Sequence, residues 1–214
     1  MNINYKVPFY SNTADNVHCV QASFKMICEY FVPRTKISFK EWDKITTHKP
    51  GLWTWSTSGL MWFKKKGFEV VNIEAFDYNQ FSIEGVKYLV NFFGEEVGRS
   101  QIEHSDIKQE MIISKDFVKK IKLETRIPKL QEIKTLLKDG FIVVCNINSY
   151  ALDDEKGYSG HAVVVKGCTD SNLILHDPGL PPRQDLEVSD EKFYKAWAYP
   201  NENACNLSAI KLKI

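Results

Sequence analysis

The sequence predicts an α+β protein, with helices early in the chain and a predominantly antiparallel sheet late. Three observations favour this class. An amphipathic helical pattern begins near residue 19, helical patterns recur between residues 82 and 137, and runs of β-branched residues follow residue 141. A chain of 214 residues can bury one full core and shows no internal repeat, so we expect a single domain over residues 1–214.

The composition excludes several functional classes. A net charge of +1 without a basic patch gives no reason to expect a nucleic-acid partner. No apolar signal region opens the chain and no apolar run reaches membrane-spanning length, so we expect a soluble, cytoplasmic protein with no membrane partner. Five cysteines without a C-x-x-C pair or zinc-ligand spacing predict neither disulfides nor a metal site, and no cofactor is expected.

The elements follow from periodicity and from Gly and Pro residues at their ends. Residues 2–10 should form an extended arm at a sheet edge. Helices are expected around residue 42 and over residues 57–66, 82–93, 105–121, 128–137 and 191–198. Strands are expected over residues 68–73, 123–126, 141–147, 161–168, 172–176 and 207–214, with a polar loop over residues 149–160.

The helix near residue 19 carries the candidate nucleophile. Its apolar stripe recurs at helical spacing: Val20, Phe24, Ile27 and Phe31. Asp15 and Asn16 are expected to cap its start. Cys19 lies at the flank of the stripe in the first turn, whereas Cys28 lies nearer its middle and is the better core residue. The helix dipole favours a thiolate at Cys19, although a small apolar residue beneath a loop is the alternative interpretation.

A histidine and a carboxylate in the late strands could activate this thiol. His161 opens a strand, and the next strand ends in His176 and Asp177. Because successive side chains point to opposite faces of a sheet, only one of these two can face His161, and Asp177 is the better candidate. A carboxylate on one imidazole nitrogen leaves the other free to take the thiol proton. Cys19, His161 and Asp177 would then be nucleophile, base and orienting group.

These segments together resemble a known family. Cys19 at a helix start, G-H-A-V-V-V-K-G at His161 and L-I-L-H-D-P-G at Asp177 are similar to the papain-like cysteine peptidases, specifically the bacteriocin-processing (double-glycine leader) peptidases and their stand-alone relatives. The separation of 142 residues (161 − 19) lies in the papain-like range of roughly 130–150. The resemblance implies a papain-like fold and a thiol peptidase with a Cys-His-Asp triad.

One family feature is missing. The family carries a Gln six residues before the cysteine, and its amide shares the oxyanion hole with the cysteine N–H; Thr13 stands at this position. We expect Asn12 to replace that amide, with Asn16 as the other amide nearby. Gln21 lies nearly opposite Cys19 on the helix and is a poor substitute.

Other polar residues near the triad carry weaker signals. His18 is expected to face solvent or the edge of a cleft, and His48 and His104 lie in loop-like sequence. Asp153 and Asp154 are expected to be solvated loop charges.

The residues are compatible with several functions. The first is hydrolysis of a peptide or isopeptide bond through a Cys19 thioester. The second is an acyltransferase or transpeptidase with the same triad, and the third is a non-catalytic peptide-binding module, motivated by the missing Gln. A purely structural role of the three residues is the fourth. The expected partner is a peptide or acyl substrate.

Aromatic residues could contribute to a substrate groove. Trp53, Trp55 and Tyr150 are the candidates for such a groove. Aromatic residues that pack a helix are commoner, however, so we expect the cluster of Trp53, Trp55, Trp62 and Phe63 to belong to the core.

Overall fold

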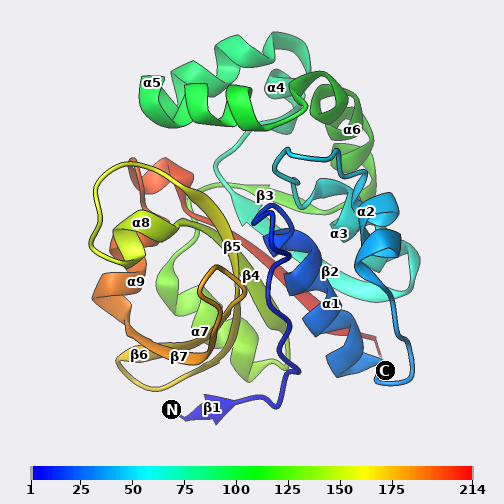
Figure 1. Ribbon diagram of the computed structural model, residues 1–214, viewed down its shortest axis with the longest axis vertical. Helices are drawn as coiled ribbons and strands as arrows, with labels where there is room; N and C mark the ends of the chain where they lie inside the picture. The colour runs from blue at the N-terminus through cyan, green and yellow to red at the C-terminus, as the bar shows by residue number, and fades with distance from the viewer. Residues whose placement is uncertain (1, 214) are drawn as a thin grey trace.

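The computed structural model describes residues 2–213, and its strands form one mixed sheet (Figure 1). The strands are β1 (Ile3–Asn4), β2 (Phe68–Glu74), β3 (Leu123–Thr125), β4 (Ile142–Asn148), β5 (Gly160–Cys168), β6 (Asn172–Asp177), β7 (Arg183–Ser189) and β8 (Asn206–Leu212). Their order in the sheet is β3-β2-β8-β4-β5-β6-β7, and β1 pairs with β5. Among these strands only the β2–β3 pair is parallel. The predicted α+β class is confirmed.

Helices cover both faces of this sheet. They are α1 (Cys19–Phe31), α2 (Phe39–Thr46), α3 (Thr57–Lys65), α4 (Tyr78–Glu84), α5 (Val86–His104), α6 (Ile107–Lys120), α7 (Leu130–Lys138), α8 (Ser149–Leu152) and α9 (Asp190–Trp197), with a short 3-10 turn η1 (Glu202–Ala204). Figure 1 shows α4, α5 and α6 gathered above one end of the sheet. Within residues 2–213, no helix combines the length and apolar character needed to cross a bilayer.

Two apolar layers hold these helices to the sheet. On one face, Phe24 of α1 packs with the inward side chains of Val70, Val144 and Val164. On the other face, α7 and α9 pack against the alternate residues of the same strands, including Val143. Because side chains alternate along a strand, the central strands are apolar on both faces, as their β-branched composition predicts.

The largest departure from the predicted elements lies between β2 and β3. One helix was expected over residues 82–93, but the structure has α4 and α5, separated at Gly85. Gly85 has φ +56°, a backbone conformation that suits glycine. Gly94 lies inside α5 with φ +81° and ψ 174°, so α5 consists of two helical segments that meet at this residue. The extra length of α5 brings its second half over the sheet end.

Strand β7 and helix α8 were not predicted. The chain over Arg183–Ser189 is mostly polar, and its edge position next to β6 leaves much of it exposed, so the buried run typical of a strand is missing. Helix α8 is a single turn in the expected loop, capped by Asn148, whose side chain accepts a hydrogen bond from the Tyr150 N–H.

Helix α1 begins at Cys19 as predicted, but its cap is different. The Asn12 side-chain Oδ1 accepts hydrogen bonds from the N–H of His18 at 2.7 Å and of Thr13 at 2.9 Å. Asn16 adopts φ +60° in the intervening turn, which folds the chain back and places Asn12 beside the helix start. The expectation that Asp15 or Asn16 caps α1 was wrong: the N-cap residue is His18, which makes no side-chain cap hydrogen bond, and Asn12 satisfies its N–H instead.

Candidate functional site

The predicted nucleophile and base meet where α1 packs against β5. Cys19 is the first residue of α1, and His161 is the second residue of β5. Both line one cavity of about 140 Å³. Cys19 is partly exposed, whereas His161 is 8% exposed and Asp177 is 1% exposed. The structure therefore brings together side chains that are 142 residues apart in sequence (161 − 19).

Asp177 lies directly behind His161. Its Oδ1 is 2.6 Å from His161 Nε2 and accepts the Gly179 N–H at 2.8 Å. Arg183 donates to the other oxygen, Oδ2, from Nε at 2.9 Å and from Nη2 at 2.6 Å. Although burial opposes ionisation, the hydrogen bond and charge of His161, together with the Gly179 and Arg183 donors, lower the pKa of Asp177 to about 2. Asp177 is therefore an ionised group in a fixed orientation.

The remaining ring nitrogen of His161 is available to the Cys19 thiol. With Nε2 engaged by Asp177, Nδ1 is left to face Cys19. Burial acts to raise the pKa of the Cys19 thiol, but the hydrogen bond and charge of His161 outweigh it and lower that pKa. Burial acts to lower the pKa of His161, but Asp177 and Cys19 outweigh it and raise that pKa. The pair is therefore stabilised as thiolate and imidazolium.

The other cysteines have the opposite electrostatic environment. Cys28, Cys145, Cys168 and Cys205 are all buried. Burial raises the pKa of Cys28 to about 11 and that of Cys205 to about 12, and it also raises the pKa values of Cys145 and Cys168. Cys19 differs from all four in both exposure and the direction of its pKa shift.

His176 lies away from this pair, as the alternation along β6 predicts. It is fully buried, and its Nε2 lies 2.9 Å from the carbonyl oxygen of Val7. Its Nδ1 accepts the Asp185 N–H at 3.2 Å. His176 therefore anchors the N-terminal arm to β6.

Asn12 does not line the cavity. Its Oδ1 caps α1, and its Nδ2 donates to Asn16 Oδ1 at 2.9 Å. Its own N–H donates to the carbonyl oxygen of Pro178 at 2.7 Å. The contacts made by Asn12 therefore tie together the loops that flank Cys19 and Asp177.

Gln21 is fully buried on the far side of α1. Its Nε2 donates to Thr54 Oγ1 at 3.0 Å. It therefore contributes no oxyanion donor, as the sequence predicts.

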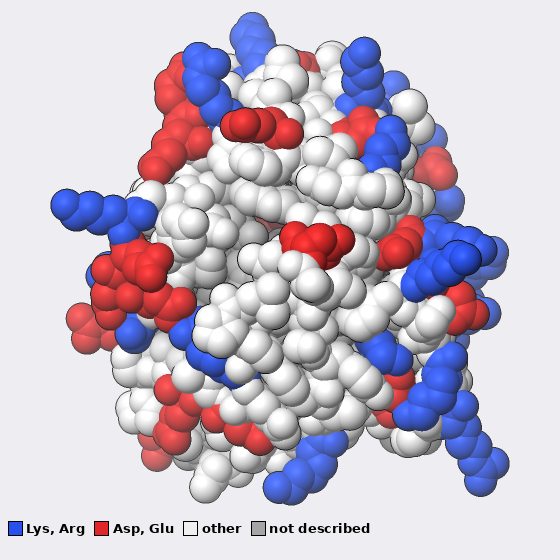
Figure 2. All heavy atoms as spheres, in the orientation of Figure 1, with Lys and Arg blue, Asp and Glu red and all other residues white. Residues whose placement is uncertain are grey.

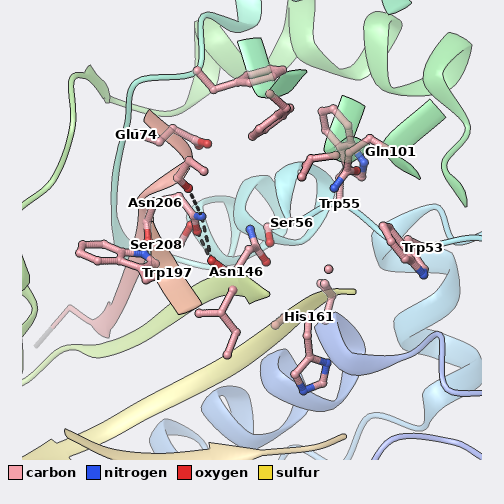
Figure 3. Close-up of a pocket in the computed structure, with 18 of the residues that line it drawn as sticks. Trp53, Trp55, Ser56, Glu74, Gln101, Asn146, His161, Trp197, Asn206 and Ser208 are labelled. Atoms are coloured by element: carbon pink, nitrogen blue, oxygen red, sulfur yellow. Dashed lines mark hydrogen bonds between the residues drawn. The ribbon is translucent and has the colours of Figure 1, made fainter. Parts of the chain in front are cut away.

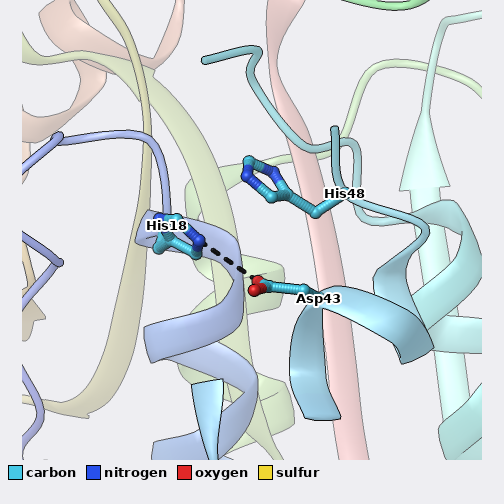
Figure 4. Close-up of side chains that lie close together, drawn as sticks. All are labelled: His18, Asp43 and His48. Atoms are coloured by element: carbon cyan, nitrogen blue, oxygen red, sulfur yellow. Dashed lines mark ion pairs between the residues drawn. The ribbon is translucent and has the colours of Figure 1, made fainter. Parts of the chain in front are cut away.

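His18 is buried and does not line the cavity, so the prediction that it faces solvent or the edge of a cleft was wrong. Its Nδ1 lies 2.6 Å from Thr13 Oγ1 and 3.1 Å from Asp15 Oδ1, and its Nε2 lies 3.2 Å from Asp43 Oδ1 (Figure 4). Its ring is 4.4 Å from that of His48, centroid to centroid. Each polar partner comes from a segment packed beside α1, which draws the side chain inward.

His18, Asp43 and His48 are also the candidate metal ligands in the described part of the chain, with ligating atoms within 4.8 Å of one another. Two imidazoles and a carboxylate suit zinc. His18 Nε2 and Asp43 Oδ1 already pair with each other, however, so an ion would have to break that contact. As it stands, the cluster is a hydrogen-bonded network that fixes the residue before Cys19.

The cavity extends well beyond Cys19 and His161. Figure 3 shows His161 on one side of it, Glu74, Asn206 and Ser208 on another, and Trp53, Trp55 and Gln101 on a third. In Figure 2 the surface is hollowed below the helical group of α4, α5 and α6, and mostly uncharged atoms border the hollow. The second half of α5 therefore roofs a cavity whose floor is the sheet.

Trp53 and Trp55 line this cavity, and Trp55 also packs against the core, as predicted. The ring of Trp53 stacks on His104 with centroids 4.7 Å apart, and its backbone N–H donates to the His104 carbonyl oxygen at 2.6 Å. Trp55 donates from Nε1 to Ser105 Oγ at 3.1 Å. Contacts with the end of α5 therefore hold both rings at the cavity wall. Trp62 and Phe63 pack in the core as predicted, and Tyr150 does not line the cavity.

Sequence reasoning missed several residues of the site. Arg183 holds Asp177 and also pairs with Asp153, which is an exposed loop charge, as predicted, but has an ion-pair partner. Asp154 likewise pairs with Lys192 and Lys195. These ion pairs of Asp153 and Asp154 join residues that are far apart in the sequence, so no local sequence pattern predicts them.

Glu74 was also missed, although one signal was available. Along the core-facing positions of β2, the apolar residues Phe68 and Val70 give way to Asn72 and Glu74. Such a switch to polar residues on a core face marks the end of the core.

Comparisons with known proteins give a consistent result. A family model described as "Peptidase_C39 like family" matches residues 89–201, a segment that includes His161 and Asp177 and lies after Cys19. The crystal structure of a protein described as a C39-like peptidase from Bacillus anthracis aligns with 100% of this chain and 98% of its own, with a TM-score of 0.53 and 15% identity. This likeness shows a shared papain-like fold.

A second solved structure is similar at a lower score. The peptidase domain of Streptococcus ComA, described as a bi-functional ABC transporter involved in a quorum-sensing pathway, aligns with 98% of this chain and 99% of its own. The identity is 13% and the TM-score 0.49. No curated protein matched the chain.

Proposed function

The chain belongs to the Peptidase_C39-like family, and on this premise we propose that it is a cysteine peptidase that cleaves a peptide or isopeptide bond through a thioester on Cys19. One observation carries the proposal: His161 lies between Asp177, at 2.6 Å, and the Cys19 thiol, whose pKa it lowers. This is the arrangement that activates a thiol for acyl transfer.

The reaction follows from these contacts. The Cys19 thiolate attacks the carbonyl carbon, and the tetrahedral intermediate collapses as the C–N bond breaks. His161 gives its proton to the departing amine. It then accepts a proton from the water that attacks the thioester carbonyl carbon. The C–S bond breaks, which releases the acid and restores the Cys19 thiolate and the His161 imidazolium. Asp177 keeps the imidazole in the orientation that serves both transfers.

The oxyanion needs donors near the start of α1. The first N–H groups of a helix have no partner within the helix, so the Cys19 N–H can serve. Because Asn12 points its amide into the loop, we assign it a positioning role in place of the oxyanion role expected from the sequence.

A non-catalytic peptide-binding module is the second candidate, and the absence of the family's Gln favours it. Thr13 stands where the family has Gln, and its hydroxyl is occupied by Asp15 and His18. Loss of one oxyanion donor costs about 10²–10³ in rate. A slow enzyme can tolerate this loss, and the loss would not affect a protein that only binds peptides.

The pH dependence of Cys19 alkylation separates the two candidates. Iodoacetamide modification of the native protein would be followed by peptide mass spectrometry, and the four buried cysteines serve as internal references. A thiolate paired with His161 predicts a rate plateau extending well below the free-thiol pKa of about 8.5. His161→Ala should remove the plateau, whereas Asp154→Asn, an exposed site, should retain it. If the alkylation rate of wild-type Cys19 depended on pH as that of an ordinary thiol does, the proposed enzymatic activity would be rejected.

Turnover would then be measured on a mixture of synthetic peptides by mass spectrometry. Wild type should form an acyl-enzyme and release cleaved products, and Cys19→Ala should form neither while keeping its melting temperature. With a competing amine present, hydrolysed products identify a peptidase, and amide products identify an acyltransferase. Cleavage retained in Cys19→Ala would contradict the proposal.

A further inference from the structure

The cavity that holds Cys19 has a polar end built from two adjacent strands. On the face of the sheet that α1 covers, Asn72 and Glu74 of β2 lie beside Ser208 and Asn206 of β8, in register. Ser208 Oγ donates to Asn72 Oδ1 at 2.7 Å. All four residues line the cavity together with Cys19. The apolar core ends here, so this end of the cavity can bind a polar group.

Glu74 is the one carboxylate of this cavity among the described residues. Its Oε1 accepts from Asn72 Nδ2 at 2.6 Å and from Tyr78 Oη at 3.0 Å. Within residues 2–213 no protein donor reaches Oε2, and Figure 3 shows the carboxyl group directed into the cavity. Burial raises the pKa of Glu74. This oxygen is open to the cavity and can accept a hydrogen bond from a ligand, and a cationic ligand would also favour the ionised form that burial opposes.

The walls around Glu74 are aromatic. Phe76 and Tyr78 follow β2, Trp55 comes from the loop before α3, and Phe92 and Phe93 come from α5. Aromatic faces attract cations. Among the described residues, no Lys or Arg lines the cavity, so no lysine or arginine side chain competes there for the carboxylate.

The cavity has the size of one side chain. A closed cavity of about 150 Å³ in another protein accommodates benzene, and the volume here is about 140 Å³. An aliphatic stem with a terminal ammonium or guanidinium group fits that volume. Its stem would lie along the aromatic rings while its charged head met Glu74.

We propose that the Glu74 end of the cavity is a specificity pocket that binds a lysine or arginine side chain of the peptide substrate. The inference rests on the proposed function, because the side chain is recognised in the cavity that also presents the Cys19 thiol. The carboxylate and the aromatic walls select the charge and the length of the side chain, and the triad then acts on the backbone beside it.

Binding to the inactive Cys19→Ala protein tests the pocket without any cleavage. The probes are N-acetyl-lysine methylamide and its uncharged counterparts, the norleucine and glutamine methylamides, titrated by NMR or calorimetry. The lysine probe should bind about 10- to 100-fold more tightly than either neutral probe, the range expected for a charge-assisted contact. Equal binding of all three would overturn the proposal.

Glu74→Gln keeps the size of the side chain and its acceptor for Asn72 and Tyr78. In the Cys19→Ala background it should erase the preference for lysine while leaving norleucine binding unchanged. Glu69→Gln, on the same strand but outside the cavity, should keep the preference. A lysine preference that survives Glu74→Gln would place recognition elsewhere.

Cleavage of a peptide mixture by the active protein distinguishes this inference from the proposed function. Products enriched in lysine or arginine at one position, with the enrichment lost in Glu74→Gln, would support both. Cleavage with no such enrichment would leave the peptidase standing and reject the pocket. If the lysine probe binds and no peptide is cleaved, the pocket holds and the peptidase fails.

Discussion

The backbone N–H of Asn12 donates a hydrogen bond to the carbonyl oxygen of Pro178 at 2.7 Å. Pro178 directly follows Asp177, and the Asn12 side chain accepts the N–H of His18, the residue before Cys19. The segments that carry Cys19 and Asp177 are thus connected through one residue that does not line the cavity. Asn12 therefore fixes the position of the segment before Cys19 relative to the segment after Asp177.

Asn12→Ala should therefore lower both stability and thiol reactivity. Loss of the cap costs about 1–2 kcal/mol, which corresponds to a fall in Tm of about 4 °C for a chain of this size. Thermal unfolding and the Cys19 alkylation rate would be measured together. Asn12→Asp is the matched control, because it keeps the capping oxygen. If Asn12→Asp retains stability but slows turnover by about 10²–10³, the amide itself is an oxyanion donor.

Gly179 makes room for the histidine and the carboxylate. A Cβ atom at this position would lie 2.9 Å from Asp177 Oδ1 and 3.3 Å from His161 Nε2. Gly179→Ala should displace the pair, and misplacement on the scale of 1 Å can cost about 10²-fold in rate. The Cys19 alkylation rate near pH 6 measures the effect. Leu180→Ala, at an exposed neighbouring position, should change it little. An unchanged rate in Gly179→Ala would show that the loop yields without cost.

Arg183 should matter more than its place on an edge strand suggests. It gives Asp177 two hydrogen bonds to one oxygen, and Asp153 anchors its guanidinium from the other side. Arg183→Lys keeps the charge but loses the paired donors, so Asp177 should ionise at higher pH and hold His161 less firmly. We expect the thiolate plateau to shrink in the alkylation profile. Arg126→Lys, in a surface ion-pair group, is the control. Identical profiles for both variants would argue against a role for Arg183.

Acid stability should depend on Asp177. Its pKa of about 2 in the folded protein lies below the unfolded value of about 4, so it stabilises the fold above pH 4 and that contribution disappears as the pH falls towards 2. The contribution to the free energy of unfolding is about 3 kcal/mol. Urea unfolding from pH 6 to pH 2 should show that the difference in the free energy of unfolding between wild type and Asp177→Asn narrows by this amount. A constant gap would mean that the carboxyl group has an ordinary pKa when folded.

The sequence predicted the parts of the site whose signals are local. The helical stripe of α1 placed Cys19 at a helix start, and the two late strands identified His161 and Asp177. Alternation along β6 correctly separated Asp177 from His176. Each of these inferences needs only the period of one element.

What the sequence could not predict depends on contacts between distant segments. The cap from Asn12 requires a left-handed turn at Asn16, and the support from Arg183 requires pairing of β6 with a polar edge strand. Trp53 and Trp55 reached the cavity wall because α5 runs past the expected end at residue 93 and offers them partners at residues 104 and 105. Local propensity contains no information about such partners.

Three of the five tryptophans, Trp53, Trp55 and Trp197, line the cavity. Their indoles would sense any molecule that enters, through a change in local polarity and ring contacts. The intrinsic fluorescence of the unlabelled protein is therefore an optical reporter of occupancy. It offers a way to screen ligands before any natural substrate is known.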